Sequence, residues 1–215
     1  MHWCVGVHHS ANTTHPMPSN TSIYEVFEHQ KADLLVHLLS ASSGFGQMVV
    51  FVRKLDVVHE LTSTLNHAGV IAQSLHANKK AELRERALKD FHEGKTQVLV
   101  MTEGVARAID FSGVKNMLNY DIPELKQDYL ARIELTQQAG GETITLVETQ
   151  NIQALHKFEE MLDFDLSRKT AEGFVYANQP MNSKPPRKKG AVAKGIRSKP
   201  LQNKKPKYKV KGRGK

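Results

Sequence analysis

Short apolar runs alternate with amphipathic segments through the middle of the chain. Five runs are predicted to be strands, at residues 48–52, 70–75, 98–101, 114–120 and 143–147. Segments with apolar residues every three or four positions predict helices at residues 31–39, 57–65, 82–91, 127–133 and 150–162. Strands that are apolar throughout are typical of parallel sheets covered on both faces. The pattern therefore predicts an α/β fold with a mostly parallel, twisted sheet and helices on both faces.

The two ends of the chain lack this alternation. Residues 1–21 are rich in His, Ser, Asn, Thr and Pro and are predicted to be disordered. After residue 165, and most clearly after Glu172, the chain becomes rich in Pro, Gly and Lys and has too little apolar area to offset the entropy of ordering. We therefore expect one folded domain at residues 22–165, followed by a basic disordered tail at residues 166–215.

Charge is divided unevenly along the 215 residues. Residues 1–172 hold 16 basic and all 22 acidic residues, a net charge of −6, whereas the remainder holds 14 basic residues and no acid. A concentrated cationic tail indicates a polyanion partner, and we expect RNA. The predicted RNA contacts in this tail are Lys188, Lys189, Lys204 and Lys205. The alternative is a tail that aids solubility or contacts ribosomes without a dedicated target.

Other features narrow the class of protein. The single cysteine, Cys4, excludes an internal disulfide and fits a reducing compartment, so we expect a cytoplasmic protein. No apolar run approaches the roughly 20 residues that cross a bilayer, and the N-terminus does not resemble a signal peptide. The histidines near the N-terminus lack the spacing of metal ligands, so no metal site is predicted.

Polar residues follow the predicted strands at their carboxyl ends, where parallel α/β folds bind ligands. Arg53 and Lys54 follow the first strand, His76 follows the second, Thr102 the third and Asp121 the fourth. We therefore expect a ligand site at one edge of the sheet.

Residues 94–96, Gly-Lys-Thr, imitate the end of a phosphate-binding loop. The complete loop requires a glycine where Lys89 stands and leads from a strand into a helix, whereas this tripeptide follows a predicted helix. The chain has no other glycine-rich loop and no acidic box that could hold magnesium. We therefore predict no catalytic residues, and we expect ATP to bind only with a partner domain.

Several ordered blocks resemble the second RecA-like domain of DEAD-box RNA helicases, over about residues 22–162. Residues 49–54 (Val-Val-Phe-Val-Arg-Lys) resemble motif IV, and residues 98–110 resemble motif V. Residues 75–84 carry a Leu-His element and the arginine of a Gln-x-x-Arg element. Residues 119–123 (Asn-Tyr-Asp-Ile-Pro) match the strand and proline turn before motif VI. The resemblance implies a single RecA-like domain.

The same resemblance implies RNA contacts on the folded domain. Thr102 and Arg84 are expected to face the RNA backbone, with Lys54 as a substitute phosphate contact. Arg53 and His76 belong to the same predicted RNA-binding set. The residues alone leave an alternative open, in which Arg84 is simply a solvated helix charge.

On the nucleotide side, the resemblance implies that Asp110 reaches the ribose of ATP in a cleft between two RecA-like domains. Arg107 and Arg132 are assigned to the same nucleotide-binding set. Two alternatives remain open: Asp110 could cap the turn that follows it, and Arg107 could pair with a carboxylate for structural reasons.

Motif VI departs from the family pattern. The family's His-Arg-Ile-Gly-Arg-Thr-Gly-Arg aligns with residues 131–138 (Ala-Arg-Ile-Glu-Leu-Thr-Gln-Gln), which keep a single arginine. Leu135 and Gln138 stand where the resemblance places two arginines against the γ-phosphate, and loss of such a group costs roughly 10³ to 10⁵ in rate. Ala77 and Ala108 also replace glycines that let the backbone approach a ligand.

The sequence thus predicts an RNA-binding, helicase-like C-terminal domain, truncated or divergent, without ATPase activity of its own. One alternative is the C-terminal half of a split RNA helicase, completed by a separate RecA-like chain. Another is a non-catalytic module that docks on ribonucleoprotein or on a full-length helicase. The predicted partners are RNA and a RecA-like ATPase domain or ribonucleoprotein, and not a membrane.

Overall fold

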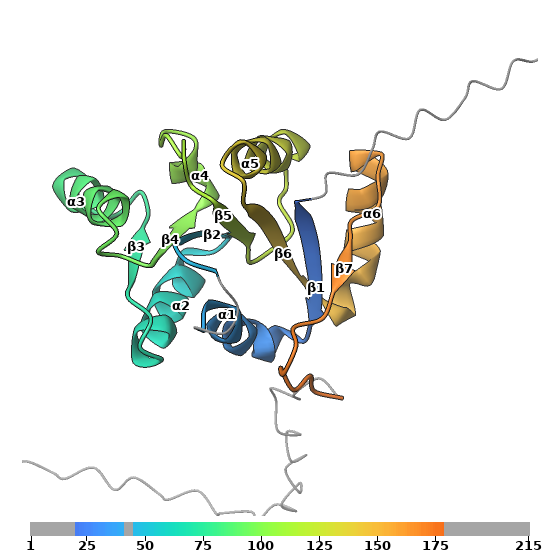
Figure 1. The fold of residues 1–215 in the computed structure, drawn as a ribbon. Coiled ribbons are helices and arrows are strands. Elements are labelled where there is room, and N and C mark those ends of the chain that lie inside the picture. Colours follow the sequence, from blue (N-terminus) through green and yellow to red (C-terminus); the bar gives the residue numbers. More distant parts are fainter. Residues whose placement is uncertain (1–19, 41–44, 179–215) are drawn as a thin grey trace, which may run out of the picture. The chain divides into compact units, whose positions relative to one another are not determined.

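The computed structural model describes residues 20–40 and 45–178. Within them a sheet of seven parallel strands has the order β3-β4-β2-β5-β6-β1-β7 (Figure 1). The strands are β1 (Thr21–Val26), β2 (Met48–Val52), β3 (Ala72–Leu75), β4 (Val98–Thr102), β5 (Asn116–Asn119), β6 (Glu142–Glu148) and β7 (Arg168–Lys169). The helices are α1 (Lys31–Leu39), α2 (Leu55–His67), α3 (Ala81–His92), α4 (Glu103–Ala106), α5 (Lys126–Gln138) and α6 (Ile152–Leu162), with single turns η1 (Glu28–Gln30) and η2 (Thr149–Asn151).

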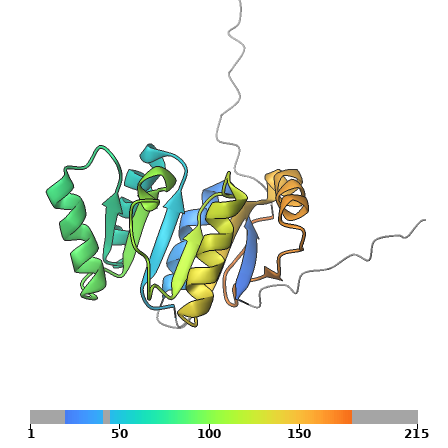
Figure 2. The same cartoon turned by 90° about the horizontal axis from the view of Figure 1, so that it is seen from above.

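Helices cover both faces of the sheet (Figures 1 and 2). Helices α1 and α2 pack on one face, against strand residues that include Val50 and Ile144. Helices α3, α5 and α6 cover the other face, where the strands contribute Leu99 and Val147. Every residue of β2 is buried, as its uninterrupted apolar sequence requires. The prediction of a parallel α/β sheet with helices on both faces is confirmed.

The five predicted strands correspond to β2–β6, and β3 and β5 are shorter than predicted. The apolar pattern does not predict β1, because Thr21, Ser22 and Glu25 interrupt its hydrophobic residues. Long-range pairing forms this strand instead, since β1 pairs with β6 at six register positions and both Thr21 and Ser22 are buried. The two-residue strand β7 and the one-turn helix α4 are too short to show a period. No helix in the described part is long and apolar enough to cross a membrane.

The folded domain extends beyond the predicted boundaries at residues 22 and 165. At its start, the Asn20 side chain donates to the Ile133 carbonyl, 3.2 Å away. At its end, Leu166 is buried and β7 pairs with β1. Tyr176 also packs against the core and accepts a hydrogen bond from the Ala171 backbone N–H at 2.9 Å.

This difference has a physical cause. Phe174 and Tyr176 lie in a segment of mixed composition. Their packing against the core, which includes the contact of Phe174 with His37 of α1, depends on tertiary contacts that the local sequence does not reveal. The remainder of the two predicted disordered segments, residues 1–19 and 179–215, lies outside the described residues.

Candidate nucleic-acid interface

The carboxyl ends of β3, β4 and β2 lie next to one another at one edge of the sheet. Val52 pairs with Thr102, and Leu75 pairs with the residue before Thr102. His76 therefore lies level with Thr102 on one side, and Arg53 follows directly on the other. We call this row of strand ends, with the first turns of the helices that follow β2 and β3, the carboxyl edge. It brings together the residues that the strand-end positions predict.

Arg84 and Lys54 lie where helices leave the carboxyl edge. Arg84 is in the first turn of α3, and its backbone N–H donates to the Lys80 carbonyl at 3.1 Å. Lys54 is the residue before α2, and its side chain is exposed. Thr102 is half-buried before α4, and its hydroxyl makes no capping bond to that helix. Among the described residues, nothing pairs with the cationic group of Lys54 or Arg84, so both can meet phosphates.

His76 is enclosed at the end of β3. Its Nδ1 is buried and has no hydrogen-bond partner among the described residues, and its ring lies edge-on to His59 with centroids 4.8 Å apart. Burial, then the nearby His59 and Lys79, lower the pKa of His76. The imidazole is therefore neutral at neutral pH, and its predicted contact with RNA would be a hydrogen bond rather than a charge pair.

The Arg53 side chain is bound to the loop after β5. Its guanidinium donates to the Ile122 carbonyl at 2.9 Å and lies 3.5 Å from the Glu124 carboxylate. Its backbone N–H donates to Asp121 at 3.2 Å. The structure therefore gives Arg53 a role in holding the β5 loop, and leaves Lys54 as the more available cation.

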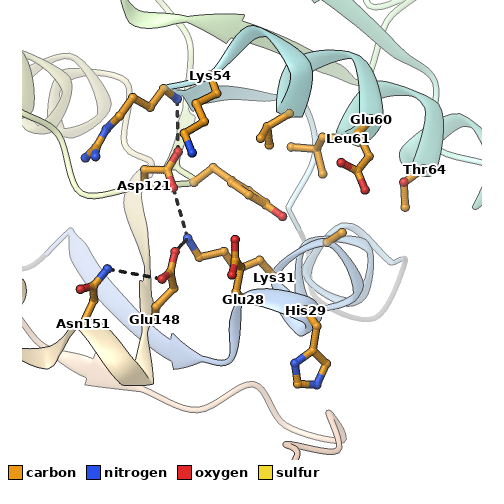
Figure 3. A pocket seen from close by; sticks show the side chains of 14 residues that line it. Glu28, His29, Lys31, Lys54, Glu60, Leu61, Thr64, Asp121, Glu148 and Asn151 are labelled. Atoms are coloured by element: carbon orange, nitrogen blue, oxygen red, sulfur yellow. Dashed lines mark hydrogen bonds and ion pairs between the residues drawn. The ribbon is translucent and has the colours of Figure 1, made fainter. Parts of the chain in front are cut away.

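Asp121 belongs to a buried ion pair that sequence reasoning missed. Lys31, at the start of α1, places Nζ 3.2 Å from Asp121 Oδ1 and 2.9 Å from Glu148 Oε1 (Figure 3). The Lys31 side chain is 3% exposed. A lysine on the apolar face of a predicted helix was the available signal, because a buried charge requires a partner.

The two exposed residues of the predicted nucleotide set have structural partners. Arg107 donates to Asp128 at 3.0 Å, and this hydrogen bond and charge raise the pKa of Arg107. Asp110 accepts hydrogen bonds at 2.9 Å from the Ser112 backbone N–H and at 2.6 Å from its hydroxyl, which lower the pKa of the Asp110 carboxyl. Both geometries match the structural alternatives that the sequence leaves open.

Arg132 is buried between the sheet and α5. Its guanidinium donates to Asn119 Oδ1 and to Glu103 Oε1, the latter at 3.2 Å, and lies over the Phe51 ring. Burial lowers the pKa of Arg132, and the charge of Glu103 opposes this shift. Arg132 thus joins the motif V segment to the motif VI helix. Asn119 and Glu103, which hold it, were not predicted to be site residues.

The positions that would meet a γ-phosphate carry no cation. Leu135 is half-buried and packs against the apolar cluster beneath α3 and α4, while Gln138 donates to Glu134 at 3.2 Å. Leu135 also lines a pocket of about 180 Å³, whose arginines, Arg107 and Arg132, are both paired with carboxylates. Among the described residues that line this pocket, no cation is left without a carboxylate partner.

Four predicted RNA contacts cannot be placed. Lys188, Lys189, Lys204 and Lys205 lie outside the described residues, so their role stays a prediction.

The strand order and the carboxyl edge define a RecA-like α/β domain, and known proteins confirm this class. The model for the helicase conserved C-terminal domain matches residues 30–140. The DEAD-box ATP-dependent RNA helicase CshA of Geobacillus kaustophilus is 36% identical over 137 residues, which cover 63% of this chain and 29% of CshA. The ATP-dependent RNA helicase SrmB of Escherichia coli is 40% identical over 132 residues, covering 60% of this chain and 29% of SrmB.

Solved structures give the same result. Escherichia coli SrmB, bound to the regulator of ribonuclease activity A, superimposes with a TM-score of 0.63 at 34% identity, covering 69% of this chain and 89% of that chain. Dbp5 of Saccharomyces cerevisiae, bound to RNA and ADP BeF3, has a TM-score of 0.61 at 27% identity, covering 71% of this chain and 41% of that chain.

The chain belongs to the family of helicase conserved C-terminal domains, and the described part is a C-terminal domain of the DEAD-box type. The resemblance seen in the sequence is confirmed. The chain spans about three tenths of the length of CshA and SrmB, the two relatives described above.

Proposed function

We propose that this domain binds RNA along its carboxyl edge and that the chain alone does not hydrolyse ATP. The observation that carries the proposal is the register of β3, β4 and β2, which places Thr102 beside His76 and Arg53. Lys54 and Arg84 flank this row, and their cationic groups have no partner within residues 20–40 and 45–178. A strand of RNA could therefore meet two free charges and a hydroxyl group along one edge.

The distribution of charge supports the same proposal. The folded part has a net negative charge, so phosphates are attracted by local cations and not by the whole surface. The 14 basic residues after residue 172 add a sequence-independent contribution that weakens steeply with salt. We expect the carboxyl edge to position RNA and the basic segment to supply most of the affinity.

The inference about ATP follows from motif VI. Leu135 and Gln138 cannot neutralise charge that develops during phosphoryl transfer, and Arg132 is held between Glu103 and Asn119. ATP binding would require a second RecA-like domain, which makes such a domain, or a ribonucleoprotein, a proposed partner together with RNA. The solved SrmB complex with a protein regulator and the Dbp5 complex with RNA are consistent with both kinds of partner.

RNA binding is tested on the full chain by fluorescence anisotropy with a labelled single-stranded RNA over a range of salt concentrations. The double variant Lys54→Ala/Arg84→Ala should bind several-fold more weakly, with a salt slope reduced by about 0.7 for each lost phosphate contact. Lys157→Ala, an exposed lysine on α6, is the matched control. If the double variant bound RNA as tightly as this control does, the proposal that RNA binds at the carboxyl edge would be wrong.

A second experiment separates the contribution of the carboxyl edge to RNA affinity from that of the basic residues after residue 172. Replacing Lys188, Lys189, Lys204 and Lys205 by alanine should lower affinity for all RNA sequences alike, because these residues would contact phosphates. ATP turnover is measured in parallel, with and without RNA. RNA-stimulated turnover above background by the purified chain would contradict the inference that it is inactive alone.

A further inference from the structure

A second pocket, of about 490 Å³, lies where β2, β5 and β6 end on the side covered by α1 and α2 (Figure 3). Its inner part already contains an ammonium group from the chain itself. Lys31 Nζ lies between Asp121 and Glu148 and 5.1 Å from the centre of the Tyr120 ring. Two carboxylates and an aromatic ring are the groups that hold organic cations in proteins.

The outer part of this pocket offers the same kinds of group without a cation. Glu28 comes from η1 and Glu60 from α2, both are exposed, and neither has an ion-pair partner among the described residues. Tyr120 also lines the pocket and is 9% exposed, yet no described residue bonds to its hydroxyl group. A tyrosine that is nine-tenths buried, whose hydroxyl group bonds to no described residue, and two carboxylates without a described ion-pair partner therefore share one cavity.

The electrostatic environment of Tyr120 indicates which sign of charge the outer part of the pocket favours. Burial and then four carboxylates, those of Asp121, Glu60, Glu28 and Glu148, raise the pKa of Tyr120. Each of these carboxylates makes the potential at the phenol more negative. The phenol stays protonated, and a cation placed beside it would be stabilised.

The other cations that line the pocket do not fill this position. Arg53 is bound to the loop after β5, through Ile122 and Glu124. Lys54 extends from the start of α2 on the Asp121 side of the pocket, whereas Glu60 lies farther along α2 (Figure 3). An RNA phosphate would face the four carboxylates, so the pocket itself does not suit RNA.

We propose that the outer part of this pocket binds a lysine or arginine side chain of a protein partner. The apolar side chains of Ala32, Val57 and Leu61 line the same pocket and suit the methylene stem of such a residue. Its charged head then lies among Glu28, Glu60 and the Tyr120 hydroxyl group, which can accept a hydrogen bond. This interaction goes beyond RNA binding and involves different groups, although Lys54 lines this pocket as well.

The proposal is tested by two-dimensional NMR titration of the full chain at neutral pH. The probe is the tripeptide acetyl-Gly-Arg-Gly-amide, and the control is the same peptide with citrulline, an uncharged analogue of arginine. The arginine peptide should cause saturable shifts at Glu28, Glu60 and Tyr120, and the citrulline peptide should not. Similar shifts with both peptides, or none with either, would overturn the proposal.

Substitutions test whether the arginine peptide binds at this pocket. The double variant Glu28→Gln/Glu60→Gln should weaken binding of the arginine peptide by about tenfold or more, because two charge-assisted hydrogen bonds are lost. Tyr120→Phe should weaken it by a smaller factor. Glu82→Gln, an exposed glutamate on α3 on the other face of the sheet, is the matched control and should bind normally.

Further results would show that the pocket binds a different ligand or none. Full binding by the double glutamine variant overturns the site, as does an RNA oligomer that shifts the same residues when the peptide does not. Binding of 1,4-diaminobutane without binding of the peptide overturns the assignment to a protein side chain. RNA binding along the carboxyl edge is measured separately through Lys54 and Arg84, so failure here leaves that proposal standing.

Discussion

The guanidinium carbon of Arg132 lies 3.8 Å from the centre of the Phe51 ring. The same guanidinium bonds to Glu103 and Asn119, and its side chain is 7% exposed. One buried cation therefore satisfies two polar groups and covers an aromatic ring. The arginine that remains in motif VI is thus held by structural contacts within the domain.

Replacing Arg132 by methionine should reduce the free energy of unfolding by about 3–5 kcal/mol, because the Glu103 carboxylate would lose its partner in a poorly solvated place. Urea denaturation measures the change. Arg107→Met is the control, since Asp128 and Glu103 are each 21% exposed whereas the Arg107 side chain is 59% exposed and that of Arg132 is 7% exposed. A similar loss of stability in both variants would show that the burial of Arg132 is not the cause.

The same residue shows what the sequence could and could not predict. The apolar runs predicted β2–β6 because strands buried on both faces need apolar residues throughout. The positions of polar residues directly after these strands then predicted that they gather at the carboxyl edge, since parallel strands all end on the same side. Side-chain partners were not predictable, because Arg132 meets Asn119 and Lys31 meets Glu148 only after distant segments pack together. Local sequence does not encode such pairs, so roles carried over from a family pattern need a structure to test them.

Lys31 should contribute to stability through its two carboxylate partners. Lys31→Met keeps most of the side-chain volume but leaves Asp121 and Glu148 facing each other without a cation. The side chains of these acids are 29% and 25% exposed, so water offsets part of the loss, and we expect a reduction of about 1–3 kcal/mol. Urea denaturation of Lys31→Met and of the exposed control Lys157→Met measures it. A loss no larger than that of the control would contradict the role of the pair.

His76 should make stability depend on pH. Its folded pKa lies below the ordinary value of 6.5, mainly because of burial, so the unfolded chain binds the proton more readily. The contribution of neutral His76 is fully present above that ordinary value and is lost as the pH falls through it toward the lower folded pKa. Thermal unfolding over this pH range should therefore show a steeper acid-side loss for the wild type than for His76→Gln. Identical pH profiles would show that His76 titrates as it does in the unfolded chain.

Gly141 should tolerate no side chain. It lies between α5 and β6, where a Cβ atom would be 1.8 Å from the Lys115 backbone carbonyl oxygen. Because the obstacle is backbone that is fixed by the bond from the Glu142 N–H to the same oxygen, at 3.0 Å, the strand ends must separate to make room. We expect Gly141→Ala to cost about 1–3 kcal/mol or more.

Gly104→Ala provides the matched control for this prediction. Gly104 lies within α4, has no positive φ, and has no heavy atom within 4 Å of the position of a Cβ. Alanine there should leave stability unchanged or raise it by about 0.5–1 kcal/mol, since glycine is the weaker helix former. Comparing the urea midpoints of the two variants measures the destabilisation that comes from the close contact with the Lys115 carbonyl oxygen. A Gly141→Ala protein as stable as the Gly104→Ala protein would mean that β5 and β6 separate at this end without cost.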